Sequence, residues 1–327
     1  MGRIAAGLVV LTGAILIGLA GYGLHKAYTR PFEPHVLGAE QVIEIGPTVQ
    51  ATVQRLEQAG LAYPNLFKGY LRLKGHDRKL QPGEIRLNSR WNMAQLAQAL
   101  MSGPRVQYAI TFIPGTRFEQ AWQSVRQAPK LKHTLPDLAT VKRMLQVAHL
   151  EGQLLPETYF YQLGDTDAQV LKRAHQALWR YLEQKWPARQ PDLPLKTPYE
   201  ALVLASIVEK ETGVAEERPL IAGVFINRLR RGMRLQSDPT TIYGLGDQFD
   251  GNLRKRDLRA HTPYNTYRIK GLPPTPIALA SKAAIDAVLH PAKTKALYFV
   301  AKGDGTHHFS RTLKEHNRAV QRYQLGR

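Results

Sequence analysis

The residues most suggestive of chemistry are two glutamates at the end of a predicted helix. Residues 197–200, Thr-Pro-Tyr-Glu, have the pattern of a helix start: a capping threonine, a proline in the first turn and a glutamate that can reach back to the cap. Residues 201–208 are apolar on nearly every side, so we expect a buried helix. It finishes in residues 209–213, Glu-Lys-Glu-Thr-Gly, with the glycine as the expected stop.

Two physical effects predict a raised pKa for a glutamate in this position. The C-terminal end of a helix carries partial negative charge, and burial disfavours an ionised carboxylate. A raised pKa lets a carboxyl group keep its proton near neutral pH, as a general acid must. Glu211 continues the apolar stripe of Ile207 and Val208, so we expect it to face an apolar cleft wall. Glu209 lies on a face of smaller side chains and is expected to pair or to face solvent. The position of the two glutamates at a helix end is equally compatible with an alternative, in which both are solvated residues of a fraying end.

An apolar stretch opens the chain. Residues 4–24 carry no charge, and as a helix they would span roughly 30 Å, about one hydrocarbon core. We expect a membrane helix here, either retained as an anchor or cleaved as a signal segment. Arg3 precedes the stretch, and Lys26 and Arg30 follow it. Charge alone would therefore put the C-terminal side in the cytoplasm, and it does not settle the topology.

Between this stretch and the glutamates, a unit of strand, turn and helix recurs. Three pairs of predicted strand and helix form it: residues 42–45 with 53–59, 82–87 with 96–101, and 109–113 with 118–125. Their spacing is loose, which indicates a weak internal repeat. Proline-rich residues 31–34 predict a short, stiff exit from the first helix. Residues 185–196, also rich in proline, predict a connection between helices.

From residue 150 onward, short motifs follow one another in a fixed order. They are Leu150-Glu151-Gly152, Pro156-Glu157-Thr158-Tyr159, Ala205 to Thr212, Val224 to Leu229, Gly232 to Thr240, Ile242-Tyr243-Gly244, Tyr264 to Tyr267, Gly271 to Pro274, His290-Pro291-Ala292 and Leu297 to Val300. Each motif is weak by itself. The ordered series closely resembles the bacterial endolytic murein transglycosylases, the YceG-like family.

The resemblance implies an architecture of three parts. An N-terminal membrane anchor would occupy residues 1–30, a small LysM-like module 31–107, and a YceG-like catalytic domain 108–327. The expected fold class is α+β: a single transmembrane helix, a small α/β module and a mixed α+β catalytic domain. The resemblance also implies a single-pass protein of the inner membrane with its catalytic domain in the periplasm.

The resemblance further implies a reaction at one carboxyl group. The family cleaves the β-1,4 bond between N-acetylmuramic acid and N-acetylglucosamine without adding water, which leaves a 1,6-anhydro end. Ending the elongation of nascent glycan strands is a further implied role. The catalytic glutamate belongs to the Glu-Lys-Glu-Thr motif, and we place it at Glu211, with Glu209 as the alternative. This chain has Gly213 where the family has alanine. No metal or organic cofactor is expected.

Candidate ligands for the sugar strand carry amide, carboxylate or aromatic groups. They are Gln236, Asp238, Tyr243, Asn265, Tyr267 and Glu157. Loop capping by Asp238 and Asn265, and packing by the tyrosines, fit the sequence equally well.

The charge balance indicates an acidic partner. The 327 residues include 45 Lys and Arg against 26 Asp and Glu, a net charge of +19, and no cysteine. A chain without cysteine has no disulfide, thiolate metal site or cysteine nucleophile, and it is compatible with the periplasm. With the resemblance, the expected partners are peptidoglycan glycan strands, the inner membrane through residues 4–24, and cell-wall synthases such as penicillin-binding proteins.

Several other functions compete with the transglycosylase. A lysozyme-type hydrolase needs a second carboxylate, for which Glu157 and Asp238 are available. A non-catalytic peptidoglycan-binding scaffold would need no acid at all. Nucleic-acid binding is disfavoured because the basic residues form only short runs and no recognition module occurs. His307, His308 and His316 lack metal-ligand spacing, so we expect no metal site.

Overall fold

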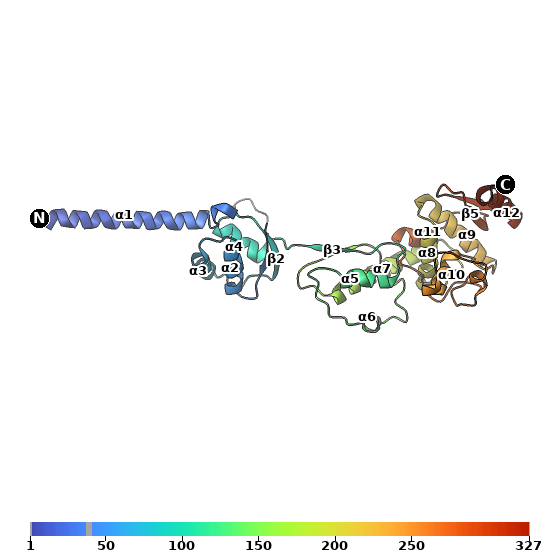
Figure 1. The fold of residues 1–327 in the computed structure, drawn as a ribbon. Helices are drawn as coiled ribbons and strands as arrows, with labels where there is room; N and C mark the ends of the chain where they lie inside the picture. Colours follow the sequence, from blue (N-terminus) through green and yellow to red (C-terminus); the bar gives the residue numbers. More distant parts are fainter. Residues whose placement is uncertain (1, 37–40, 327) are drawn as a thin grey trace. The chain divides into compact units, whose positions relative to one another are not determined.

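Contacts along the chain divide it into two units, each described by itself. The computed structural model describes residues 2–36 and 41–326. One unit comprises residues 1–108 and 161–164, and the other comprises residues 109–160 and 165–327. Helices and short strands are mixed in both, which confirms the expected α+β class (Figure 1). The expected boundaries at 30 and 107 stay predictions, and residues 37–40 of the expected module lie outside the described residues.

The first unit begins with helix α1 and continues in the order strand, helix, helix, strand, helix. Its elements are α1 (Gly2–Thr29), a short 3₁₀ turn (Pro34–Val36), β1 (Gln41–Ile45), α2 (Val49–Gln58), α3 (Pro64–Leu73), β2 (Gly83–Leu87) and α4 (Met93–Ser102). Strands β1 and β2 pair antiparallel, with Ile43 opposite Ile85. Both strands and helices α2 and α4 were predicted from the sequence, whereas α3 was not.

The last turn of α1 belongs to the core of this unit. Ala27 is buried with Phe32, Leu56 and Leu96 in one apolar cluster. Backbone hydrogen bonds fasten the following segment to the α2–α3 turn, from Ala62 N–H to the Pro31 carbonyl and from Glu33 N–H to the Gly60 carbonyl, each 2.8 Å long. The stiff exit predicted at residues 31–34 is therefore fixed to the module by hydrogen bonds and packing.

Helix α1 covers the residues predicted to cross a membrane, 4–24. Within the described part of the chain, however, no helix is both long enough and apolar enough to span a bilayer. The structure therefore does not support the predicted transmembrane helix.

The second unit is mostly helical. Its elements are α5 (Phe118–Arg126), α6 (Leu138–Leu145), α7 (Asp167–Lys185), α8 (Pro198–Glu211), α9 (Arg218–Arg230), α10 (Asp238–Leu245), α11 (Lys282–Leu289), β5 (Tyr298–Ala301), β6 (His307–Ser310) and α12 (Leu313–Gln324). Short 3₁₀ turns lie at Trp186–Ala188, Ala215–Glu217, Gly246–Gln248 and Asp257–Arg259. Strands β5 and β6 form an antiparallel pair. Strands β3 (Tyr108–Thr111) and β4 (Thr158–Tyr161) pair with each other.

Helix α8 lies at the centre of the second core. Its residues 201–208 are all buried, and they pack with apolar residues of α7, α9 and α11 (Figure 1). Ser206 connects it to the segment before α11, because its hydroxyl accepts a hydrogen bond from Ile277 N–H at 3.0 Å. The end of α8 is therefore held at a defined position, and residue 211 with it.

Gly152 gives a test of this packing. Its φ is +73°, and an added Cβ would overlap the ring of Pro276. We expect Gly152→Ala to lower the free energy of unfolding by about 2–4 kcal/mol, as measured by urea unfolding of the full chain. Gly213→Ala is the control, because its φ is not positive and no atom lies within 4 Å of the new Cβ. A change within about 0.5 kcal/mol is expected there, and equal losses in both variants would contradict the packing described.

Candidate active site

A cleft of about 520 Å³ opens at the C-terminal end of α8. Its lining residues come from the ends of α8 and α9, the turn at 235–238, Tyr267, strand β5 and helix α12. Glu211, the last residue of α8, lies in this lining, and Glu209 does not.

The sequence around α8 explains why the helix begins and ends where it does. The Thr197 side chain accepts a hydrogen bond from Glu200 N–H at 3.1 Å, and Pro198 occupies the first turn. Glu200 reaches back to Lys196 N–H, one residue further than a capping box requires. The helix ends because Thr212 turns to an extended backbone (φ −146°, ψ 138°) and its hydroxyl accepts a hydrogen bond from Val214 N–H. Gly213 is thus not the left-handed stop that the sequence predicted.

The Glu211 carboxyl group has the properties of a general acid. Burial raises its pKa from 4.5 to about 7, and the nearby charge of Asp238 adds to the rise. The Ser237 hydroxyl, which donates to Glu211 Oε1 at 2.5 Å, and the charge of Arg228 both act to lower that pKa. The side chain is only partly exposed to the cleft. At neutral pH both the protonated and the ionised form are therefore populated.

Glu209 has a structural environment. Its side chain is 6 % exposed, and Oε2 accepts hydrogen bonds from the backbone N–H (2.9 Å) and the hydroxyl of Ser281. Ser281 is the N-cap of α11, so the carboxylate lies at the positive end of that helix. Glu209 therefore fastens α11 to α8 and does not reach the cleft.

Arg228 is a buried cation in the wall of the cleft. It is 6 % exposed, and its guanidinium donates to the backbone carbonyls of Leu297 (2.6 Å) and Leu235 (2.8 Å). It also donates to Gln236 Oε1 at 3.2 Å and lies 5.0 Å from the ring centre of Tyr298. Arg228 thus joins β5 to the turn that leads into α10.

Three of the six predicted sugar-binding residues line the cleft with Glu211: Gln236, Asp238 and Tyr267. The Tyr267 hydroxyl donates to Asp238 Oδ1 at 2.6 Å, and burial and that contact raise the pKa of Tyr267. Gln236 has a φ of +51°, which lets its backbone turn sharply between Leu235 and the start of α10.

The other three predicted residues lie elsewhere. Asn265 is fully buried, and its amide donates to the carbonyls of the 257–260 turn, so it caps a loop and is unavailable to a ligand. Tyr243 packs on Tyr264 and lines a separate pocket of about 230 Å³ beside Glu151. Glu157 forms an ion pair with Lys282 and is not part of the cleft lining.

Comparison with known proteins agrees with the motif series. A model of the YceG-like family matches residues 42–322. The chain belongs to the YceG-like family. A Bacillus subtilis (strain 168) protein named endolytic murein transglycosylase is 32% identical over 96% of this chain and 91% of that protein. A Streptococcus pneumoniae serotype 2 protein of the same name is 34% identical over 61% of this chain and 36% of its own length. The crystal structure of a yceG-like protein from Listeria monocytogenes is 29% identical with a TM-score of 0.54, covering 86% of this chain and 99% of that one.

Sequence reasoning on this YceG-like chain missed three residues of the cleft region. Ser237, a residue type expected to cap α10, instead donates its hydroxyl to Glu211. Arg228 begins a short basic run in the sequence, residues 228–231, yet it extends the buried stripe of Val224 and Phe225 at helical spacing. His316 lacks metal-ligand spacing, and its sequence neighbours give no sign of a place in the cleft. It stacks on Tyr298 in the cleft, and burial and Arg228 lower its pKa.

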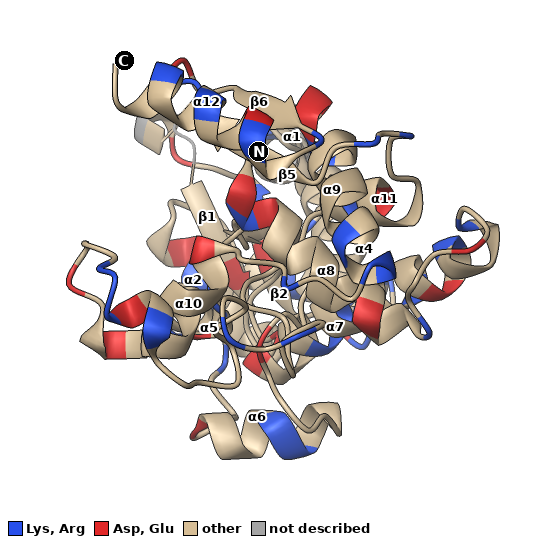
Figure 2. Ribbon diagram, turned by 90° about the vertical axis from the view of Figure 1, so that its right-hand side faces the viewer, with Lys and Arg blue, Asp and Glu red and all other residues tan. Residues whose placement is uncertain are grey.

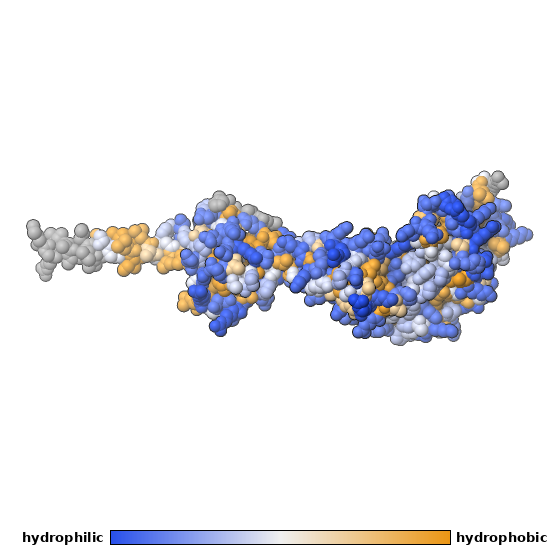
Figure 3. Space-filling model, turned by 60° about the horizontal axis from the view of Figure 1, so that its bottom comes forward, coloured by the Kyte–Doolittle hydropathy of each residue, from blue (hydrophilic) through white to orange (hydrophobic). Residues whose placement is uncertain are grey.

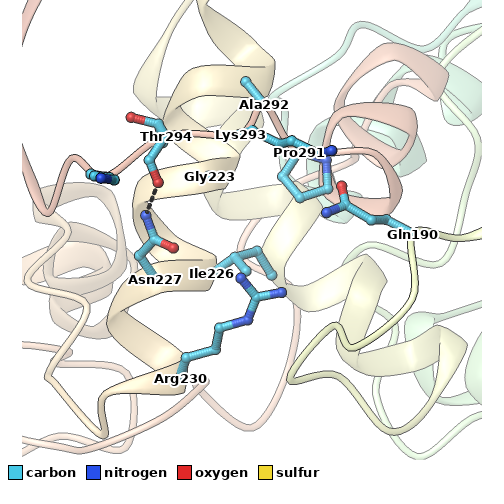
Figure 4. A pocket seen from close by; sticks show the side chains of 10 residues that line it. Gln190, Gly223, Ile226, Asn227, Arg230, Pro291, Ala292, Lys293 and Thr294 are labelled. Atoms are coloured by element: carbon cyan, nitrogen blue, oxygen red, sulfur yellow. Dashed lines mark hydrogen bonds between the residues drawn. The ribbon is translucent and has the colours of Figure 1, made fainter.

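A third cavity, of about 340 Å³, lies on a different face of α9 from Arg228. Figure 4 shows Arg230 and Gln190 beside it, with the Asn227 amide donating to the Thr294 carbonyl at 2.8 Å. Lys293 and Lys295 make this cavity basic. Elsewhere Lys and Arg are spread over many elements, such as α6, α9 and α12 (Figure 2). The positive charge of this YceG-like chain is therefore not gathered at the cleft.

The raised pKa of Glu211 predicts how stability depends on pH. Since that pKa is about 7 in the fold against 4.5 ordinarily, the folded protein binds more protons than the unfolded chain between these values. The free energy of unfolding should therefore fall as the pH rises through this window, by up to about 3 kcal/mol. Glu211→Gln cannot ionise, so it should lose this dependence and exceed the native protein in stability near pH 8, in urea unfolding of the full chain.

Glu209→Gln is the matched control on the same helix. It removes a charged acceptor from Ser281, so a loss of about 1–2 kcal/mol is expected at both acidic and alkaline pH. Identical pH dependence in native protein and the Glu211 variant would contradict the pKa assigned to Glu211.

Proposed function

We propose that this chain is an endolytic transglycosylase that cleaves the glycan strands of peptidoglycan, with Glu211 as its acid and base. The observation that carries the proposal is a carboxyl group with a pKa of about 7 in a cleft at a helix end. The printed name of the relatives, endolytic murein transglycosylase, supports the same reaction class.

The first step would use the protonated form of Glu211. Its proton passes to the glycosidic oxygen as the bond from this oxygen to C1 of N-acetylmuramic acid breaks, through an oxocarbenium-like transition state. Burial makes this transfer feasible at neutral pH, because it is the main cause of the raised pKa.

The second step would use the carboxylate that the first step leaves. It accepts the proton of the muramyl 6-hydroxyl while the oxygen of that hydroxyl bonds to C1 and closes the 1,6-anhydro ring. Glu211 recovers its proton, and no water is consumed. One carboxyl group with a pKa near the working pH serves in both steps, whereas a hydrolase normally uses two carboxylates. Ser237 would hold the carboxylate in place between the steps.

The remaining cleft residues offer the contacts that a sugar strand needs. Gln236 and Asp238 provide amide and carboxylate groups for sugar hydroxyls and N-acetyl groups, and Tyr267 and Tyr298 provide aromatic surfaces. Arg228 contacts both Gln236 and Tyr298 and would hold these two side chains in position in the cleft. The lining residues come from several helices and strands. Such a cleft could bind a glycan strand at a point away from its ends, as endolytic cleavage requires.

Lysozyme-type hydrolysis is the second candidate, and Asp238 is the observation in its favour. Asp238 lines the cleft and lies close enough to Glu211 to raise its pKa, so a second carboxylate is present. Water would then attack in place of the 6-hydroxyl, and the product would keep a reducing end.

The location of the protein and the role of its first unit belong to the same proposal. Leu11, Ile15, Leu16, Ile17 and Leu19 of α1 are exposed, and they contribute to an apolar surface on this helix (Figure 3). We assign this surface to the inner membrane, with the second unit in the periplasm. The order strand, helix, helix, strand from β1 to β2 supports a LysM-like, glycan-binding role for the first unit.

Digestion of purified sacculi tests the reaction. The native chain should release fragments with 1,6-anhydro ends, which are lighter by one water than hydrolysed ends in mass spectrometry. Glu211→Gln should lower the rate about 100- to 10,000-fold, since it removes the acid but keeps the shape. Glu183→Gln, an exposed change on α7, is the control and should leave the rate unaltered. Reducing ends alone would establish hydrolysis, sacculus binding without cleavage would favour a scaffold, and undiminished cleavage by the Glu211 variant would remove that residue from the mechanism.

Fractionation of cells tests the location. The full chain should sediment with membranes and resist extraction by salt, because its apolar surface on α1 would lie in lipid. A chain lacking residues 1–24 should instead be found in the periplasmic fraction when it is exported by a cleavable signal. Recovery of the full chain in a soluble fraction would contradict the assignment, and the mass of the membrane-bound protein would show whether the segment is cleaved.

A further inference from the structure

A pocket between α9 and α11 is lined by two charged groups that each have a buried polar atom without a hydrogen-bond partner. It has a volume of about 500 Å³, and we call it the α9–α11 pocket. Its polar lining consists of Lys185, Arg218, Asp286 and His290. None of its lining residues belongs to the lining of the Glu211 cleft, so it is a separate site within the same unit.

Arg218 is the first residue of α9, and its guanidinium is poorly satisfied. The side chain is only 17 % exposed, and its Nε is buried without a hydrogen-bond partner. The nearest charge is Glu209, whose Oε1 lies 4.0 Å from Nη2, too far for a hydrogen bond. Among the described residues, this group of five N–H donors therefore makes no hydrogen bond.

Asp286, on α11, is half satisfied. Its Oδ2 accepts a hydrogen bond from the Tyr181 hydroxyl at 2.7 Å. Its Oδ1 is buried and has no partner among the described residues. A carboxylate has room for several donors on its two oxygens, so one whole side of this group is unused.

Two charged side chains of opposite sign that lack some of their hydrogen bonds line this one cavity, and they indicate what it would bind. Leaving a buried charged group without hydrogen bonds is costly, and native proteins normally avoid it. An anion would satisfy Arg218 but not Asp286, and a cation would do the reverse. A group carrying both charges close together satisfies both, and Lys185 adds a second donor for its negative end.

We infer that the α9–α11 pocket binds a free amino acid group, with its carboxylate on Arg218 and Lys185 and its ammonium on Asp286. The choice of ligand rests on the proposed function, because peptidoglycan stems that contain 2,6-diaminopimelate present such a zwitterionic end until they are cross-linked. The pocket would then bind stem peptides that are not yet cross-linked, while the Glu211 cleft binds the glycan. Arg218 also faces Glu209, which fastens α11 to the catalytic helix, so the bound group would lie next to that junction.

Calorimetry on the full chain with three small probes tests the ligand class. The probes are 2,6-diaminopimelate, which has both charges at each end, pimelate, which has carboxylates only, and 1,5-diaminopentane, which has amines only. We expect diaminopimelate to bind at least about tenfold more tightly than either of the others. Equal binding of pimelate would overturn the inference in favour of a plain anion site, and failure of all three to bind would overturn it outright.

Two substitutions test the assigned contacts. Arg218→Gln and Asp286→Asn should each weaken diaminopimelate binding about 10- to 100-fold, and Arg230→Gln, in the separate basic cavity near the end of α9, should not. Without ligand, both variants should melt within a few degrees of the native chain, because Arg218→Gln loses only the 4.0 Å contact with Glu209 and Asp286→Asn keeps an oxygen that can accept from Tyr181. Earlier melting with unchanged affinity would assign both residues a purely structural role and overturn the inference.

The result can be separated from that of the proposed function. Cleavage is measured on glycan strands stripped of their peptides, and binding is measured on the Glu211→Gln variant as well. Diaminopimelate binding by a chain that cuts no glycan would uphold the pocket and reject the reaction. Glycan cleavage without diaminopimelate binding would uphold the reaction and reject the pocket.

Discussion

Removal of one carboxyl group from water is the interaction on which the site depends. The pKa of Glu211 is about 7 chiefly because protein surrounds it, and protein surrounds it because α8 runs through the centre of its unit. Helices α7, α9 and α11 cover the body of α8, and the Ser206–Ile277 hydrogen bond fixes the segment beside it. A shift of this helix toward solvent would lower the pKa of Glu211, so packing far from the cleft sets the protonation of this carboxyl group.

The two glutamates in the last turn of α8 differ in the hydrogen-bond partners of their carboxyl groups, and therefore in their roles. Glu209 and Glu211 are the same residue type, two positions apart, and both are largely removed from solvent. Glu209 accepts two hydrogen bonds from Ser281, the N-cap of α11, and they hold that helix in place. Glu211 accepts one hydrogen bond, beside a like charge on Asp238. Loss of activity on changing Glu209 would thus report on the fold before it reported on catalysis.

The sequence could predict what depends on neighbours along the chain. The cap at Thr197, the buried helix and the raised pKa at its end all follow from local pattern, and strands β1 and β2 follow from short apolar runs. It could not predict the uses of Ser237 and Asn265, because each is decided by contacts with segments far away in the chain. A serine before Asp-Pro reads as a helix cap, and only the fold turns its hydroxyl toward Glu211. The position of Tyr243 could not be predicted for the same reason. On α10 this side chain faces Glu151 and not the cleft.

The union of α1 with the core that follows it has a mechanical consequence. Ala27 is buried in that core, and among the described residues hydrogen bonds at Pro31 and Glu33 fix the segment after α1 to the turn between α2 and α3. Helix α1 and the module therefore move together. A tilt or rotation of α1 would therefore turn the module with it. A force applied to the helix would reorient the module, because the segment that joins them is held by packing and hydrogen bonds.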